Sequence, residues 1–516
     1  MSEFDRIVLR NGANDREFAG VRDELSQKLA QDYGYPVTQH CTPAAVFLNG
    51  EYYGYSWVHE NYNEDYLATY FGGNKDNYEI VSNIEDADEG SERALEDYGK
   101  LYAYYDRDLT DDSTFAEYCG LVDIDNLMQY YCMQVFIANK DWPGNNYKAF
   151  RYYPSEGEEI TSEFQDGRWR FMFFDAEYAW SLYGDRPNAD TLRDLLSGTH
   201  MSGESKALIA LLAREDMREK FAATMSDLTA NAFEKNHILE TLDELCAVSD
   251  SEQLYALDKG ITSEWANRET FANSRQQIRD FADIREYVVF RNMYKLFEWE
   301  KNTYTVSVTG AGGAVTTLNT QKRNGRGILS AEYNCKCTVP LKAEIADGWE
   351  FVSWEINGVT YDTPEVELNA RTAGADGRII AKLNTKLSET TDAPLQIKEI
   401  STAKKAGYIV LYNPNSTEVS TAGLYITDKP EKLDRWEIPA RSVPAYGELL
   451  IVTDNNKTES ALHQLQANFS LKKGETLILS DKGGNILAEV PVPDIPEGSV
   501  YAFQDYGQYR AVPSAD

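Results

Sequence analysis

Hydrophobic and polar residues alternate with different periods along the chain, and the change of period divides it into parts. Up to residue 299 most apolar positions recur at helical spacing, as they do across residues 123–139, where one face of a helix would be buried. From residue 303 onward the apolar residues alternate with polar ones in short runs rich in threonine and glycine, which is the spacing of strands. The pattern predicts a mixed, mostly helical N-terminal part followed by β regions.

Two β regions are predicted after the helical part. A small all-β module is expected at residues 303–385, and a polar linker leads from it to residues 393–516, where regular short strands between turn signals suggest a sandwich. With 516 residues the chain is also too long for one core, since cores stop growing at about 250–300 residues. The sequence therefore predicts a multidomain α+β protein, with domains at 1–299, 303–385 and 393–516.

A helix and a hairpin are predicted near the N-terminus. Residues 16–34 keep apolar positions on one helical face and end in glycine, which indicates an amphipathic helix. Residues 43–62 place Asn49-Gly50 between an apolar run and an aromatic run, which is a strong hairpin signal. The apolar positions of the predicted helix are Phe18, Val21, Leu25 and Leu29.

The chain carries a formal net charge of −34, from 84 acidic and 50 basic residues. This excess argues against an electrostatic grip on nucleic acid or on anionic lipid, and it favours a bound divalent ion or a cationic partner. No run of about 18 apolar residues occurs, so we predict no transmembrane segment. The first residues lack the basic start and apolar run of a signal peptide, so we expect none within this chain.

The cysteines and histidines form no recognisable metal or catalytic pattern along the sequence. The six cysteines lack framework spacing, and Cys335 and Cys337 form a single Cys-x-Cys without a second pair. The five histidines are scattered. We therefore predict neither a zinc site nor a Ser-His-Asp triad.

Residues 138–150 stand out because a long apolar helix pattern runs into them and breaks at a Pro-Gly pair. Phosphoryl transfer needs a carboxylate that orients and deprotonates the attacking hydroxyl, and oxygen ligands that hold divalent ions against the phosphates. In protein kinases these parts share one loop as Asp-x-x-x-x-Asn, and Asp141 and Asn146 have this offset. Asp and Asn beside Pro-Gly are also common turn residues, so a helix stop with side-chain caps stays open as the alternative.

A second acidic position follows this loop. Residues 169–174 are apolar and strand-like, and they end at Asp175, where a kinase holds its next metal ligand. An acid that ends a run of buried aromatic residues has to find a partner, and a hard cation such as Mg²⁺ accepts carboxylate and amide oxygens. This supports a metal site at Asp175, with a capped strand end as the alternative.

Four segments in this order resemble the spore coat protein H (CotH) kinase family. They are "RDELSQKL", "VFLNGEYYGYSWVHE", "VDIDNLMQYYCMQVFIANKDWPGNN" and "WRFMFFDAEYAW", and the resemblance covers roughly residues 5–290. It implies an atypical protein-kinase-like domain with a helix-rich C-lobe. It also implies transfer of phosphate from ATP to Ser or Thr hydroxyls of proteins, with Mg²⁺ or Mn²⁺.

The resemblance assigns roles to individual residues. Asp141 would be the catalytic acid of the loop, and Asn146 or its neighbour Asn145 would be a metal ligand. Asp175 would be the ligand equivalent to the Asp of the kinase Asp-Phe-Gly motif, and Glu177 could assist at the metal. These assignments follow from the family and not from spacing alone.

The nucleotide side of the expected site is less complete. Glu60, at the end of the second hairpin strand, is a weaker candidate for the segment that borders the nucleotide, and a solvated strand-end acid is an equal alternative. Residues 1–10 are too short for the strands and the basic, Ser-rich segment that the family usually has upstream. No phosphate-binding Lys or Gly-rich loop is visible, and Arg6, Arg10 and Arg22 are equally well explained as surface ion-pair partners. The domain is expected to be N-terminally incomplete, either trimmed or inactive.

The two β regions have likenesses of their own. Residues 303–385 look like the B-repeats of bacterial surface proteins, and residues 393–516 are similar to a lamin-tail domain, an immunoglobulin-like sandwich. Both likenesses imply an extracellular or cell-surface location, attachment through these modules, and surface or envelope proteins as candidate substrates.

Three functional hypotheses remain after the sequence. The first is a secreted or cell-surface kinase. The second is a catalytically inert kinase-like scaffold or adhesion protein, which the missing upstream strands favour. The third is carbohydrate binding, since 34 tyrosines and nine tryptophans could provide stacking platforms, although most of them fall in core patterns.

Overall fold

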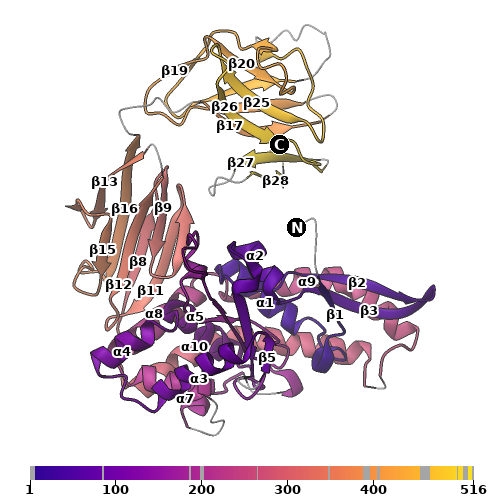
Figure 1. Ribbon diagram of the computed structural model, residues 1–516, viewed down its shortest axis with the longest axis vertical. Helices are drawn as coiled ribbons and strands as arrows, with labels where there is room; N and C mark the ends of the chain where they lie inside the picture. Colours follow the sequence, from indigo (N-terminus) through magenta and orange to yellow (C-terminus); the bar gives the residue numbers. More distant parts are fainter. Residues whose placement is uncertain are drawn as a thin grey trace.

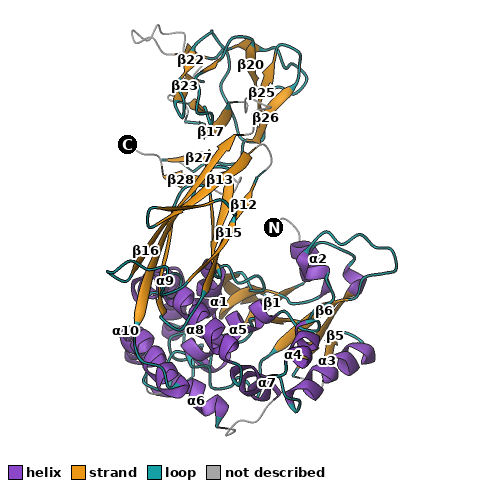
Figure 2. Cartoon of the chain, turned by 90° about the vertical axis from the view of Figure 1, so that its left-hand side faces the viewer, coloured by secondary structure: helices purple, strands orange, loops and turns teal. Residues whose placement is uncertain are grey.

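The computed structural model describes most of the chain, and its parts are arranged in three tiers (Figures 1 and 2). Helices and two small sheets form the N-terminal body, strands up to residue 387 stand against it, and a further group of strands lies beyond them. The multidomain α+β class is thus confirmed. The described residues are 6–83, 86–184, 187–197, 203–263, 265–346, 349–387, 395–403, 407–453, 465–496, 498–503 and 509–513.

The N-terminal sheet contains the predicted hairpin. Strands β1 (Ile7–Arg10), β2 (Cys41–Leu48) and β3 (Glu51–Glu60) pair antiparallel in the order β1-β3-β2. Asn49 has a φ of 52° and Gly50 a φ of 85°, the two positive values that a two-residue type I′ turn requires. The hairpin prediction is confirmed, and Figure 1 shows β2 and β3 extending away from the helical body.

Helix α1 (Arg22–Tyr33) differs from the predicted amphipathic helix over residues 16–34. It begins later, and it is buried on almost every side instead of on one face. Its polar side chains find partners inside the fold. Ser26 accepts a hydrogen bond from the indole of Trp180 at 2.8 Å, and Arg22, for which a surface ion pair was one alternative, pairs with buried Asp15. The helix and its end at Gly34 are confirmed, but the prediction of a solvent-facing side was wrong. Polar groups that have partners can be buried, so polarity did not mark the solvent side.

A second sheet and the next helices flank residues 138–150, which lead from α5 into β6. The sheet has the order β5-β4-β6-β7, and the strand expected over residues 169–174 is only three residues long. The helix predicted at residues 123–139 is confirmed as α5, which Asp123 caps by accepting hydrogen bonds from two backbone amides. The elements of this region are β4 (Tyr78–Ser82), β5 (Asp86–Glu89), β6 (Lys148–Tyr152), β7 (Arg170–Met172), α2 (Glu64–Phe71), α3 (Glu92–Tyr105), α4 (Asp112–Cys119) and α5 (Ile124–Ile137).

Five more helices complete the N-terminal body. The longest, α10, packs against α5, α6, α8 and α9. No helix within the described ranges is long and apolar enough to cross a membrane. The helices are α6 (Thr191–Leu196), α7 (Gly203–Leu212), α8 (Glu215–Thr229), α9 (Lys235–Asp258) and α10 (Arg268–Phe297).

The strands of residues 303–387 form two sheets that share one hydrophobic core with the helices. The sheet orders are β10-β9-β12-β15 and β11-β8-β16-β13-β14, and β16 runs parallel to β8. This part is therefore packed on the N-terminal body rather than tethered to it. The strands are β8 (Thr303–Thr309), β9 (Ala314–Leu318), β10 (Gln321–Asn324), β11 (Ile328–Asn334), β12 (Val339–Ile345), β13 (Trp349–Ile356), β14 (Val359–Tyr361), β15 (Glu365–Leu368) and β16 (Arg378–Leu387).

The C-terminal strands enclose a second, separate core. The larger sheets have the orders β24-β23-β18-β17-β27-β28 and β21-β20-β25-β26. The predicted polar linker begins inside β16, and residues 388–394 lie outside the described ranges. The strands are β17 (Gln396–Ser401), β18 (Tyr408–Tyr412), β19 (Val419–Ser420), β20 (Leu424–Thr427), β21 (Trp436–Glu437), β22 (Ser442–Val443), β23 (Glu448–Val452), β24 (Leu465–Gln466), β25 (Thr476–Asp481), β26 (Ile486–Pro491), β27 (Ser499–Phe503) and β28 (Tyr509–Pro513).

Candidate functional site

The loop after α5 brings three of the predicted residues together. Ala138 ends the helix in the left-handed conformation, with a φ of 53°. Asp141 then accepts hydrogen bonds from the amide nitrogens of Asn145, at 3.2 Å, and of Asn146, at 2.7 Å. Because the nitrogen of the Asn146 amide is used, its carbonyl oxygen is the atom that could face a metal.

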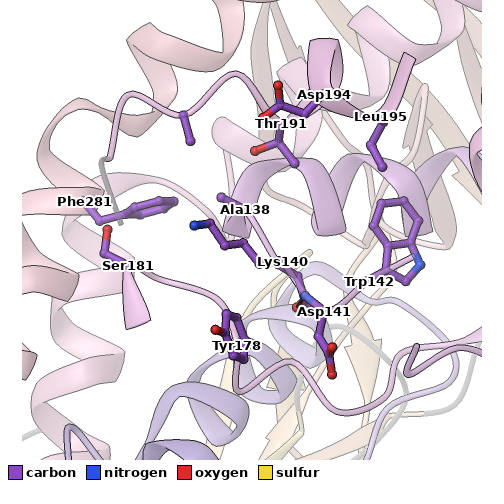
Figure 3. Close-up of a pocket in the computed structure, with 12 residues that line it drawn as sticks. Ala138, Lys140, Asp141, Trp142, Tyr178, Ser181, Thr191, Asp194, Leu195 and Phe281 are labelled. Carbon is purple, nitrogen blue, oxygen red and sulfur yellow. Dashed lines mark hydrogen bonds between the residues drawn. The ribbon is translucent and has the colours of Figure 1, made fainter. Parts of the chain in front are cut away.

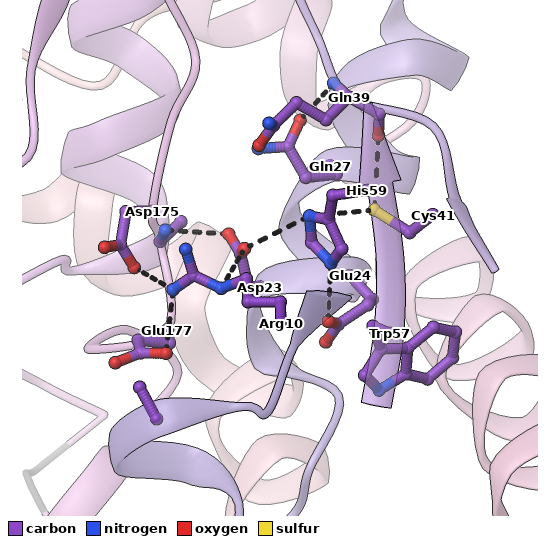
Figure 4. A network of polar contacts seen from close by, with 12 residues as sticks. Arg10, Asp23, Glu24, Gln27, Gln39, Cys41, Trp57, His59, Asp175 and Glu177 are labelled. Carbon is purple, nitrogen blue, oxygen red and sulfur yellow. Dashed lines mark hydrogen bonds and ion pairs between the residues drawn. The ribbon is translucent and has the colours of Figure 1, made fainter. Parts of the chain in front are cut away.

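Asp175 lies three residues beyond the end of β7, in the left-handed region with a φ of 50°. A non-glycine residue in this conformation is strained, and such positions cluster at functional sites. The next amide, that of Ala176, donates to Oδ1 of Asp23 on α1 at 2.8 Å. The turn is therefore anchored to the central helix, and it presents the carboxylates of Asp175 and Glu177 on the same side (Figure 4).

Arg10, the last residue of β1, lies between these acids (Figure 4). Its Nη2 donates to Oδ1 of Asp175 and, at 2.8 Å, to Oε2 of Glu177, and its Nε lies 3.3 Å from Oδ2 of Asp23. Only 15% of the side chain is exposed. Of the two alternatives left open for Arg10, the surface ion pair does not apply, because pairing of β1 with β3 carries the guanidinium into the site. A basic residue that ends an apolar strand was the one signal in the sequence.

The acids and the guanidinium change one another's ionisation. Burial raises the pKa of Asp175 above its ordinary value, Arg10 opposes the rise, and the charges of Asp23 and Asp141 add to it. Burial also raises the pKa of Glu177, again against Arg10. For Arg10 burial alone would lower the pKa, but the three carboxylates it contacts outweigh that effect and raise it. Three acids around one cation, with Asp141 acting on Asp175 as well, favour a further positive charge, and their oxygens suit a hard divalent ion.

The two predicted assistants at the metal are not equivalent. Glu177 already uses both oxygens, because Oε1 accepts from the backbone and side-chain nitrogens of Asn14, each at 3.1 Å, and Oε2 accepts from Arg10. Within the described part of the chain, Asp175 accepts a hydrogen bond on one oxygen alone, Oδ1. Asp175 is thus the better placed of the two to bind a metal.

A buried polar cluster beside Arg10 was not expected from the sequence. Asp23 and Glu24 on α1 lie next to His59 on β3, with ligand atoms all within 4.8 Å of one another, and Nε2 of His59 is 3.0 Å from Oε1 of Glu24. Burial raises the pKa of Glu24. Along the sequence the histidines look scattered, because 35 residues separate Glu24 from His59. Only the fold brings the two side chains together.

Glu60 lies at the end of β3 but is not a solvated strand-end acid. It is buried, with Oε2 accepting from the amide of His40 at 3.0 Å and Oε1 accepting from the hydroxyl of Tyr70 at 2.7 Å. Both oxygens therefore have partners inside the fold. A nucleotide at this position could therefore contact only the backbone around Glu60 and not its carboxylate.

A pocket of about 550 Å³ adjoins Asp141 on the side of α6 and α10 (Figure 3). The side chain of Lys140 points into this space beside Phe281, as Figure 3 shows. The hydroxyl of Ser181 is buried there, and it has no hydrogen-bond partner within the described ranges. A polar and apolar recess that begins at the loop acid can accept a side chain of another molecule. The remaining lining residues are Ala138, Asn139, Trp142, Tyr178, Ala189, Thr191, Asp194 and Leu195.

Arg285 on α10 holds the end of α5, where the loop of residues 138–150 begins. Its guanidinium donates to the carbonyls of Val135 and Phe136 at the end of α5, both at 2.6 Å, and to the carbonyl of Ala189 at 2.8 Å. The side chain is fully buried, and burial lowers the pKa of Arg285 to about 9. A buried cation satisfied by helix-terminal carbonyls ties the entry of the loop to the wall of the pocket.

Replacing Arg285 with Met should lower the free energy of unfolding by about 2–4 kcal/mol, because several buried carbonyls lose their donor. Chemical denaturation followed by circular dichroism would measure this loss. Arg279→Met on the same helix is the matched control, since that guanidinium pairs with exposed Asp243 and should change stability by less than about 0.5 kcal/mol. Equal stability of the two variants would contradict the positioning role.

The part of the chain that contains this site is similar to a known protein family. Comparison with curated proteins finds no significant match. The family model described as CotH kinase protein matches residues 1–289. The match covers more than half of the 516 residues and includes Arg10, Asp141 and Asp175. The chain therefore belongs to the CotH kinase protein family.

Proposed function

We propose that the protein transfers the γ-phosphate of ATP to Ser or Thr hydroxyls of other proteins. The observation that carries this proposal is the approach of two groups from separate elements. The hydrogen-bonded loop of Asp141 and Asn146 lies close enough to Asp175 for the charge of Asp141 to raise the pKa of Asp175. Membership in a kinase family supports the same chemistry.

The residues fit a bound divalent ion, Mg²⁺ or Mn²⁺, with ATP. Asp175 and the amide oxygen of Asn146 would hold the metal, while Asn145 and Glu177 are secondary candidates. When bound, the ion would neutralise charge on the phosphates. The donor set consists of oxygen atoms and carries an excess of negative charge, which is what a hard cation needs.

Asp141 would act on the acceptor. Its carboxylate is within reach of the pocket, so a Ser or Thr hydroxyl entering there could give it a proton as the oxygen attacks the γ-phosphorus. The bond from that phosphorus to the bridging oxygen would break, and ADP would leave. Asn145 and Asn146, which donate to Asp141, keep its carboxylate in position.

Arg10 and Asp23 support a kinase-like site from the other side. Protein kinases need an ion pair between a basic strand residue and an acid on a helix. Arg10 on β1 and Asp23 on α1 form such a strand-to-helix pair at 3.3 Å. Arg10 would then be the cation closest to the phosphates, and the segment around Glu60 would border the nucleotide through its backbone.

A catalytically inert kinase-like scaffold or adhesion protein is the alternative. Arg10 is bound to Asp175 and Glu177, the acids that a metal would need. Within the described residues the N-terminal sheet β1-β3-β2 also has three strands, fewer than the family resemblance implies. Both observations would suit a site that no longer binds a nucleotide. Binding of the metal–nucleotide complex separates the two functions.

The β parts suggest where the protein acts. We infer that residues 303–385 are a B-repeat-like module and residues 393–516 a lamin-tail-like immunoglobulin sandwich, since both regions consist of strands in packed sheets. Such modules would attach an extracellular or cell-surface protein and bring it to surface or envelope proteins as substrates.

Titration calorimetry of ATP with Mg²⁺ or Mn²⁺ into the full chain tests the proposal. The wild type should bind saturably, and Asp175→Asn should weaken binding at least about tenfold, or about 1.4 kcal/mol. Asp243→Asn is the matched control, because Asp243 pairs with Arg279 on the surface, far from the loop in sequence and outside the acid cluster. Wild-type binding that Asp175→Asn leaves unchanged would reject this site, and no binding at all would favour the inert scaffold.

A further inference from the structure

Arg10 makes two different kinds of contact with the acids around it. Toward Asp175 and Glu177 its Nη2 forms hydrogen-bonded ion pairs. Toward Asp23 its Nε is 3.3 Å from Oδ2, yet among the residues that the structure describes neither of these buried atoms has a hydrogen-bond partner. The guanidinium thus has a hydrogen-bonded side, at Nη2, and an unsatisfied side, at Nε, which makes no hydrogen bond to the described residues.

The unsatisfied side offers the guanidinium a second place to bind. The carboxylate of Asp23 is fixed, since its other oxygen accepts from the backbone amide of Ala176 at 2.8 Å and only 3% of the side chain is exposed. A small movement of Arg10 toward Asp23 would complete the missing hydrogen bond and release Asp175 and Glu177. The fold therefore contains an alternative partner for the cation it now holds.

The contacts of Arg10 coincide with the expected metal ligands. A divalent ion on Asp175 would share this carboxylate with the guanidinium already bound to Oδ1, and two cations on one carboxylate repel each other strongly. An anion beside Arg10 would reduce this repulsion, because a guanidinium pairs readily with phosphate oxygens. Metal and phosphate should then help each other to bind.

We propose that Arg10 is an internal counter-ion that competes with the divalent metal for Asp175 and Glu177 until a phosphate anion draws it away. This inference rests on the proposed function for the identity of the metal ligands. Metal alone binds weakly because it must displace Arg10, whereas metal with nucleotide binds tightly. The coupling is reciprocal, so the metal strengthens nucleotide binding by the same factor.

Binding of Mn²⁺ without nucleotide, followed by electron paramagnetic resonance, tests the competition. Arg10→Met should bind Mn²⁺ at least tenfold more tightly than the wild type, and Arg10→Lys, which keeps the charge, should stay within about threefold of it. Arg16→Met is the matched control, because Arg16 lies on the same segment but contacts Glu17 and the carbonyl of Ile261, and its Mn²⁺ affinity should be unchanged. Equal or weaker Mn²⁺ binding by Arg10→Met would overturn the proposal.

A wild-type measurement covers the case in which Arg10→Met fails to fold. Phenylglyoxal modifies accessible arginines, and mass spectrometry can follow Arg10 by itself. Saturating Mn²⁺ alone should increase modification of Arg10 severalfold, and addition of a non-hydrolysable ATP analogue should protect it again. Modification that does not respond to Mn²⁺ would overturn the proposal.

Failure of this inference can be told apart from failure of the proposed function. If the wild type does not bind the metal–nucleotide complex but Arg10→Met gains Mn²⁺ affinity, the competition holds and the kinase proposal falls. If the wild type binds the complex and removal of Arg10 leaves Mn²⁺ affinity unchanged, the kinase proposal stands and the competition is wrong.

Discussion

Asp141→Asn is expected to lower the rate of phosphoryl transfer to protein acceptors by at least about 100-fold, within the range typical for loss of a general base. The amide cannot take the proton of the attacking hydroxyl. It keeps the size of the carboxylate and an oxygen that can accept from Asn146, now 2.7 Å away. Asp175 is untouched, so binding of the metal–nucleotide complex should change by less than about threefold.

The measurement is transfer of labelled phosphate from ATP to a mixture of Ser- and Thr-containing proteins, including the chain itself, beside calorimetry of the same variant. Asp243→Asn again serves as the control and should transfer at the wild-type rate. Undiminished transfer by Asp141→Asn would remove Asp141 from the reaction. Absence of transfer by the wild type, with nucleotide still bound, would point to a binding protein.

Asp227→Ala is expected to lower the free energy of unfolding by about 3–5 kcal/mol, because one buried carboxylate joins the helices to the strands after residue 303. Asp227 on α8 is fully buried, and its two oxygens accept hydrogen bonds from backbone and side-chain donors on the β part. Removal of the acceptor leaves these donors buried and unpaired. The donors are Nδ2 of Asn319, the amide and Oγ1 of Thr320, Nε2 of Gln321 and the hydroxyl of Tyr333.

Calorimetric unfolding would check this result, together with limited proteolysis between α10 and β8. The expected outcome is a lower melting temperature and faster cleavage after residue 297. Asp283→Ala is the matched control, since Asp283 is a half-exposed partner of Lys235, and its loss should cost less than about 1 kcal/mol. Similar stability of both variants would mean that the β part is held by apolar packing alone.

Local pattern was enough to predict the elements that carry the loop. Helix α5, the hairpin with its Asn-Gly turn and the strand regions after residue 303 appear where periodicity and turn chemistry indicate them. The pairing of Asp141 with Asn146 also follows from spacing, since five residues on one tight loop cannot lie far apart. The place of Asp175 at the end of an apolar run indicated a metal ligand, and the family likeness then implied the same role.

Local pattern failed where polar side chains are satisfied by distant partners. Helix α1 was expected to show one face to solvent, but its polar residues bind groups on other elements, as Gln27 does with the carbonyl of Phe173 at 3.0 Å. Likewise the alternative of a solvated acid at Glu60 fails, because both oxygens of this buried carboxylate accept hydrogen bonds inside the fold. Polarity predicts exposure only when no partner is available, and partners far along the chain are invisible to periodicity.

The sequence by itself determined the loop, its acid and its trailing amide, because these depend on residues that are neighbours along the chain. Only the tertiary structure decided what faces them. Arg10 and Asp175 are 165 residues apart, and they meet because β1 pairs with β3 while the turn after β7 is anchored to α1. The charge balance of the site depends on that meeting, since burial and mutual distance set electrostatic energies, and neither can be read from order along the chain.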